Sequence, residues 1–133
     1  MNKLKFYILS FTWGLPMTLI GCIVAMVLKA RGYKPERYGY CWHFEVGERW
    51  GGVNLGVVFI TSKKASTHTK NHEHGHAIQN CHFGFLFPFV IAIPSLVRCW
   101  YFILTPNKKH PPYDSIWFEG QATELGNKLM ESL

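Results

Sequence analysis

Two long apolar runs dominate the pattern of hydrophobic and polar positions along the chain. The first, residues 6–28, contains 23 residues without a charge, and basic residues flank it on both sides. This length and this flanking are typical of a membrane-spanning helix. A signal peptide is the alternative, but the run exceeds a typical signal core, and the nearest small-x-small site, Ala30 to Gly32, lies in a basic stretch. We therefore expect a retained transmembrane anchor over residues 1–31, kinked at Pro16.

Between the two runs, the pattern changes to aromatic and β-branched residues interrupted by glycines. Residues 38–62 are broken by Gly47, Gly51 and Gly52, which predicts a β-hairpin with its turn near residues 46–52. The second arm, residues 53–61, is the clearer strand.

Two helices are expected in the polar segments. The first covers about residues 70–82 and has three candidate N-caps, Thr67, Thr69 and Asn71. The second covers about residues 115–131, capped by Asp114 or Ser115. At 133 residues the chain is long enough for one domain with a modest core. The pattern predicts an α+β fold in which residues 32–133 form one membrane-associated domain behind the anchor.

Residues 72–76 read His-Glu-His-Gly-His and match the pattern H-E-x-x-H. His72 and His76 are four residues apart, so both imidazoles lie on one helical face and can bind one Zn²⁺. Glu73 projects beside them, where a general base can take a proton from the attacking water. The motif follows a predicted strand and a predicted helix start, which is the context that this chemistry requires. His74 points to another face and is expected to be solvated or to lie behind the ligands.

A catalytic zinc site needs a third protein ligand, and the sequence offers two candidates. Glu119 lies on the predicted last helix, with the small residues Ala122 and Gly126 on the same face, where they allow close packing against the motif helix. His82 has the spacing of the H-E-x-x-H-x-x-G-x-x-H class, but Gln79 stands where that class has glycine. A straight helix would carry His82 about 9 Å along the axis from His76, so Glu119 is favoured.

The second apolar run, residues 83–104, is charged only at Arg98 and is interrupted by Pro88 and Pro94. If it crossed the bilayer as one straight helix, the motif and Glu119 would begin about 30 Å apart. Three ligands could then not meet. We therefore expect a re-entrant or interfacial hairpin in which the two prolines separate two short arms. A bent spanning helix with a snorkelling Arg98 is the alternative.

The net charge of +6 raises the question of nucleic acid as a partner. Lysines and arginines lie mainly beside the apolar runs, where they can meet anionic lipid head groups, and no nucleic-acid-binding motif is present. The sequence therefore indicates a lipid bilayer and no nucleic acid as a partner. The four cysteines have no C-x-x-C spacing and do not fix the compartment.

A family resemblance rests on two short segments. The motif with its following apolar, proline-containing segment, and the later segment around Glu119, resemble a group of small uncharacterised bacterial membrane proteins and, more widely, the gluzincin metallopeptidases. The resemblance implies one zinc ion per chain, held by His72, His76 and Glu119, with Glu73 as general base and a bacterial cell membrane as the location. The family pattern usually has Asp where this chain has Thr123, so a hydroxyl replaces the carboxylate that would orient a ligand histidine.

The sequence thus predicts a membrane-associated zinc metallopeptidase. Tyr113 or His110 could donate a hydrogen bond to the developing oxyanion from the loop before the last helix. The strand over residues 53–61 could pair with an extended polypeptide substrate. Two alternatives stay open: a non-catalytic membrane protein with a structural or sensory metal site, and a membrane scaffold or toxin-like peptide without metal.

Overall fold

The computed structural model describes all 133 residues as five α-helices and one four-stranded mixed sheet. This confirms the α+β class. The first apolar run forms two helices, α1 (Lys3–Ser10) and α2 (Leu15–Ala30), which meet at an angle of 91°. The expected single kinked helix is therefore wrong. Pro16 lies in the first turn of α2, where a proline needs no backbone N–H partner and its fixed φ favours helix initiation, so it helps to begin a helix.

No single helix combines the length and the hydrophobicity that crossing a bilayer requires. Two pairs of consecutive helices have the required length and hydrophobicity only when taken together, but each pair is bent. These are α1 with α2, and residues 67–86 with residues 88–104, the latter bent by 117°.

The sheet comprises β1 (Glu36–Tyr38), β2 (Cys41–Glu45), β3 (Gly52–Leu55) and β4 (Val58–Thr61), in the order β1-β2-β4-β3. The expected hairpin with a turn at residues 46–52 is wrong, because β2 pairs with β4 in parallel and does not pair with β3. The predicted strand over residues 53–61 is itself a hairpin. It turns at Gly56, which has φ +75° and whose N–H donates to the Asn54 side chain.

The motif helix α3 (Thr67–Phe83) begins three residues earlier than expected. Ser66 is its N-cap and accepts a hydrogen bond from the Thr69 N–H, so none of the three predicted caps is used. The last helix, α5 (Trp117–Ser132), starts after Ile116 without a side-chain cap, so the predicted caps Asp114 and Ser115 are also wrong.

The expected close packing of the last helix against the motif helix is confirmed. A Cβ atom on Gly75 would lie 1.7 Å from the backbone oxygen of Ala122, and one on Gly126 would lie 1.8 Å from the backbone oxygen of Asn71. Only glycine permits this distance between the two backbones, which brings Glu119 up to the two motif histidines.

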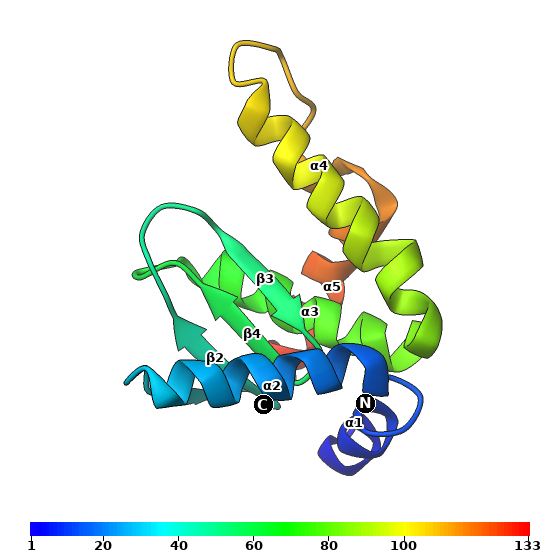
Figure 1. Ribbon diagram of the computed structural model, residues 1–133. Coiled ribbons are helices and arrows are strands. Elements are labelled where there is room, and N and C mark those ends of the chain that lie inside the picture. Colours follow the sequence, from blue (N-terminus) through cyan, green and yellow to red (C-terminus); the bar gives the residue numbers. More distant parts are fainter.

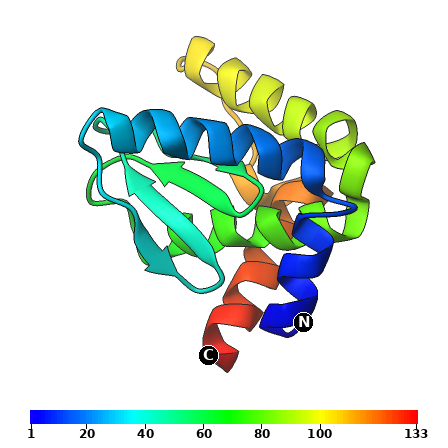
Figure 2. The same ribbon diagram turned by 60° about the horizontal axis from the view of Figure 1, so that its bottom comes forward.

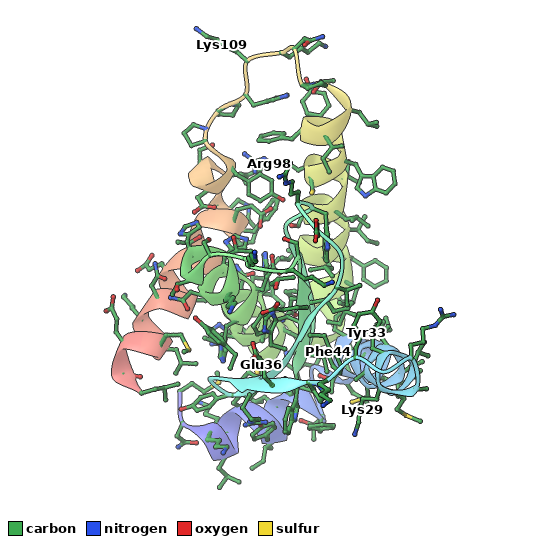
Figure 3. All side chains as sticks on the ribbon, turned by 90° about the vertical axis from the view of Figure 1, so that its left-hand side faces the viewer. Lys29, Tyr33, Glu36, Phe44, Arg98 and Lys109 are labelled. Atoms are coloured by element: carbon green, nitrogen blue, oxygen red, sulfur yellow. The ribbon has the colours of Figure 1, made fainter.

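The second apolar run reverses at another place than expected. After a 3₁₀ turn, η1 (Gly84–Leu86), a π-helical turn, η2 (Pro88–Ala92), continues directly into α4 (Ile93–Leu104). Pro94 lies in the first turn of α4, which continues from η2, and does not separate two arms. The bend of 117° lies between residues 86 and 88, beside Pro88. The chain returns through residues 105–116, which include the 3₁₀ turn η3 (Tyr113–Ser115). Arg98 donates to the backbone oxygens of Pro112 and Tyr113, and Figure 3 shows it between α4 and this returning segment.

The helices form a layer on each side of the sheet. Figures 1 and 2 show α2 crossing one face, with α3 on the other face and α5 beyond α3. α4 projects from the body at the top of Figure 1, and Figure 2 shows it on the same side of the molecule as α2. The larger buried core, which includes Phe6, Phe44 and Phe59, joins α1 and the sheet to α3. A smaller core around Phe87 and Phe118 joins η2 to α5 and forms the floor of the site.

Candidate metal centre

Three buried side chains converge where α3 and α5 pack together. Glu119 Oε1 lies 3.3 Å from His72 Nε2 and 3.0 Å from His76 Nε2. All three residues are buried, and Glu119 is completely so. The three ligand atoms lie within 4.8 Å of one another and could hold a metal ion. Glu119 therefore lies beside both histidines, where the expected third ligand has to be.

The hydrogen bonds of His76 determine which of its nitrogens carries a proton. Gln79 donates through Nε2 to the backbone oxygen of Phe118 and to Oε1 of Gln121, at 2.9 and 3.0 Å. Its own Oε1 must therefore accept, and it lies 2.7 Å from His76 Nδ1. Burial would lower the pKa of His76, but the carboxylates of Glu119 and Glu73 raise it. In the neutral form of the imidazole the proton is on Nδ1, so Nε2 presents its lone pair to the cluster.

A second chain of hydrogen bonds orients His72. The Thr123 hydroxyl donates to Asp114 Oδ2 at 2.8 Å, so its oxygen accepts from His72 Nδ1, also at 2.8 Å. Asp114 Oδ1 is itself 3.8 Å from His72 Nδ1. Asp114 therefore supplies the carboxylate that interacts with His72 Nδ1, and Thr123 mediates this interaction. In its neutral form, His72, like His76, presents the lone pair of Nε2 to Glu119.

Only one oxygen of the Glu119 carboxylate accepts a hydrogen bond. Ser95 donates to Oε2 at 2.8 Å, while Oε1 is buried and makes no hydrogen bond despite its two close imidazoles. Burial alone would raise the pKa of Glu119, but the adjacent His72 and His76 hold it well below its usual range. Two imidazole nitrogens and a carboxylate oxygen that face one point need a positive charge between them, which a proton on one imidazole or a metal cation supplies. A metal cation is the charge that all three atoms can bind at once.

Glu73 lies beside this cluster with its carboxylate toward open space. The side chain is buried but makes no hydrogen bond or ion pair with the protein, and it lines both cavities described below. Burial raises its pKa, which the positive potential of His76 and His72 partly offsets. Gly52 of β3 leaves room for it, since a Cβ atom there would lie 2.9 Å from Glu73 Cγ. A carboxylate with a raised pKa suits proton transfer near neutral pH.

Two cavities meet at the cluster, and the smaller one has the more polar wall. The larger, of about 640 Å³, is mainly apolar and lies between α2, β3, η2 and α4. The smaller, of about 250 Å³, is lined by polar side chains that include His68 and Asp114. His72, Glu73 and Tyr113 line both.

The other predicted site residues fall into two groups. Tyr113 lies at the site, with its ring centroid 6.3 Å from that of His72, and burial raises the pKa of its hydroxyl. His110 lines neither cavity; it stacks on Phe102 and lies within hydrogen-bonding distance of Thr105. His82 is exposed at the end of α3 and does not join the cluster.

His74 is neither solvated nor close to the ligands. It is completely buried on the opposite face of α3, where its Nε2 accepts the Tyr40 N–H at 2.9 Å. Burial lowers the pKa of His74 to about 4. It is therefore a neutral residue of the core.

Three residues that orient the candidate ligands were not assigned that role from the sequence. Asp114 was expected to cap a helix, Gln79 was noted only as the residue that replaces a glycine of the H-E-x-x-H-x-x-G-x-x-H class, and Ser95 lies within the apolar run. Asp114 and Ser95 reach the site from outside α3, which the local pattern does not specify, whereas Gln79 lies three residues after His76 on the same helix, so helical spacing could have indicated its contact.

No protein-family model, curated protein or solved structure matches this chain.

Proposed function

We propose that the protein is a membrane-associated zinc metallopeptidase of the gluzincin type. The observation that carries the proposal is the convergence of His72, His76 and Glu119 on one point, beside a buried Glu73 without a partner. Two imidazoles and a carboxylate, with space left for a fourth ligand, form the donor set of catalytic zinc sites.

The spacing of the donor atoms favours zinc. Ligands about 2.0–2.1 Å from a tetrahedral zinc lie roughly 3.3–3.4 Å from one another. The two distances from Glu119 to the imidazoles, 3.3 and 3.0 Å, are close to this value. Nitrogen ligands also favour zinc over calcium or magnesium, which prefer oxygen. His72, His76 and Glu119 would hold the ion.

A bound zinc ion would supply Lewis acidity toward the scissile carbonyl and the attacking water. Glu73 would then take a proton from that water and deliver it to the leaving amine. The Tyr113 hydroxyl would donate to the developing oxyanion, since its raised pKa keeps it protonated. Asp114 and Thr123 would hold His72 in one orientation and one tautomer, as Gln79 would for His76.

A polypeptide substrate is favoured by the strand beside the site. β3 pairs with β4 along one edge and has no strand along the other. The residues of β3 line the larger cavity, so its free edge borders the space next to Glu73. An extended peptide can pair with such an edge through its main chain.

Association with a bilayer is favoured by the surface of α2 and α4, which lie on the same side of the molecule (Figure 2). Many large apolar side chains of these helices are exposed, among them Ile23 and Met26 on α2 and Val97 and Leu104 on α4. Basic residues stand near the ends of both helices, where anionic head groups attract them.

The proposal is tested by zinc content and turnover together. Elemental analysis of purified protein is expected to give about one zinc per chain, lost in Glu119→Ala and kept in His82→Ala, whose side chain is exposed. Glu73→Gln is expected to keep the zinc and to lose roughly 10²–10⁴-fold in cleavage rate, because it removes the general base and no ligand. Cleavage is read by mass spectrometry on a mixed peptide library.

A zinc-loaded wild type that cleaves no peptide in the library would favour the alternative, a structural or sensory metal site. Cleavage by Glu73→Gln at the wild-type rate would contradict the assigned general base. A folded wild-type protein without zinc would remove the basis of the proposal.

A further inference from the structure

The two cavities at the candidate metal centre differ in polarity, and the polarity changes along the direction of β3. β3 and the residues just before it run past Glu73 from the smaller cavity to the larger one. Gly51 lines only the smaller cavity, Gly52 lines both, and Val53 to Leu55 line only the larger, while Trp50, before this stretch, borders both cavities. A chain extended along the free edge of β3 would therefore lie partly in polar and partly in apolar surroundings, with the reacting groups between them.

The larger cavity is also open toward the exposed apolar surface of the molecule. Leu96, Trp100 and Ile103 of α4 line this cavity, and each is more than half exposed, at 53 %, 59 % and 60 %. Ile20 of α2 lines it from the other side and is 47 % exposed. These side chains belong both to the cavity wall and to the surface proposed to meet lipid. An apolar segment could pass from a bilayer into the cavity without crossing water.

The smaller cavity suits polar residues instead. His68, Thr69 and Asp114 contribute polar atoms to its wall, and the Asp114 carboxylate is one-third exposed there. A polar or positively charged side chain can be solvated and hydrogen-bonded in this space, whereas an apolar one would displace water from a carboxylate at a cost.

We propose that the substrate is a polypeptide cleaved at the boundary between an apolar and a polar segment. The apolar side of the boundary occupies the larger cavity and the polar side the smaller one. Such a boundary occurs where an apolar segment of a protein emerges from a lipid surface. This inference rests on the proposed peptidase function, because it uses the same reacting groups.

Three peptides of identical composition test the inference. One has an apolar half followed by a polar half, the second has the halves reversed, and the third interleaves the same residues. Binding is measured by fluorescence anisotropy to zinc-loaded Glu73→Gln, without vesicles, so that the result does not depend on turnover. One of the two segregated peptides is expected to bind about tenfold or more tightly than the interleaved peptide, since it alone buries several apolar side chains together.

A matched pair of variants on α4 locates the binding. Leu96 lines the larger cavity and Val97 does not, although both are exposed on the same helix. In the Glu73→Gln background, Leu96→Gln is expected to weaken binding of the preferred peptide about fivefold to tenfold, and Val97→Gln to leave it unchanged. Zinc content, measured in each variant, is expected to stay at the level of the parent protein.

The outcomes distinguish failure of this inference from failure of the proposed peptidase function. Equal binding of all three peptides, or equal effects of Leu96→Gln and Val97→Gln, would overturn the inference. Cleavage of the interleaved peptide by the wild type at the same rate as the segregated ones would overturn it while supporting the peptidase. Preferential binding of a segregated peptide that the zinc-loaded wild type never cleaves would support the inferred ligand class and contradict the proposed function.

Discussion

Thr123 shows how a hydroxyl can stand in for a carboxylate beside a histidine of the candidate metal site. Its hydroxyl both accepts from His72 and donates to Asp114, so the negative charge of the carboxylate acts on the imidazole through a neutral group. The residue that departs from the pattern of the metallopeptidases that the sequence resembles is thus part of a complete chain of hydrogen bonds. The missing carboxylate comes from a residue nine positions earlier.

Replacing this hydroxyl is expected to weaken the metal site. Thr123→Val keeps the shape but leaves His72 Nδ1 without an acceptor, so zinc affinity is expected to fall about 10–100-fold. Competition with a fluorescent chelator measures the affinity. Thr123→Ser, which retains the hydroxyl, is the control and is expected to bind zinc as the wild type does. An equal loss in both variants would mean that the methyl group, rather than the hydrogen bond, supports the site.

At the scale of elements, the contact between α3 and α5 places the ligands. The two motif histidines come from one helix and Glu119 from the other, so the separation of the helices sets the distances among the ligand atoms. Gly75 is the point of closest approach from α3, within the motif itself. The motif H-E-x-x-H allows any residue before the second histidine, but here the packing against α5 requires glycine at that position.

Gly75→Ala is expected to disrupt both stability and metal binding. Alanine gains about 1 kcal/mol in helix propensity over glycine, but its Cβ would lie 1.7 Å from a backbone oxygen that no side-chain rotation can move. Overpacking of this kind costs about 1–3 kcal/mol or more. Urea denaturation is expected to show a net loss, with reduced zinc content in the folded protein.

The control for this variant is Glu124→Ala on the exposed face of α5, where only an exposed ion pair with Lys128 is lost. Its effect on the free energy of unfolding is expected to stay within about 0.5 kcal/mol. If Gly75→Ala is as stable as this control and keeps its zinc, the helices can separate without moving the ligands, and the packing argument fails.

At the scale of the whole molecule, the exposed apolar faces of α2 and α4 and the basic residues near their ends act together. An apolar face buried in lipid and a positive charge at the head groups each strengthen association with an anionic membrane. The net charge of +6 has this sign. We expect the purified protein to bind vesicles of anionic phospholipid more tightly than vesicles of zwitterionic phospholipid, in a flotation assay.

Two added charges on the apolar surface are expected to weaken this binding. Ile23 on α2 and Leu104 on α4 are exposed and line neither cavity, so Ile23→Glu with Leu104→Glu is expected to lower vesicle affinity at least about tenfold without changing zinc content. Thr67→Glu with Ser132→Glu adds the same charge at exposed polar positions and is the control. Equal losses in the two double variants would show that charge alone governs the binding.

Local chemistry made part of this protein predictable from sequence. The i, i+4 spacing of His72 and His76 places both on one helical face in any α-helix, and the small residues after Glu119 favour close packing of its helix. The position of Glu119 beside the two histidines followed from these patterns, and the α+β class followed from the succession of apolar, strand-like and polar segments. The predictions for Pro16 and Pro94 were wrong, because the sequence alone does not distinguish a proline in the first turn of a helix from one that breaks a helix. The difference depends on where the helix starts.

What only the tertiary structure decided depends on contacts between distant residues. The parallel pairing of β2 with β4 joins segments whose local patterns do not name their partner, so the sequence was compatible with a simple hairpin. The roles of Asp114, Gln79 and Ser95 depend on the path of the returning segment and on the approach of α3 to α5. The sequence by itself therefore determined which groups could bind a metal. The fold determined which groups hold them in place, because hydrogen-bond geometry is fixed in space and not along the chain.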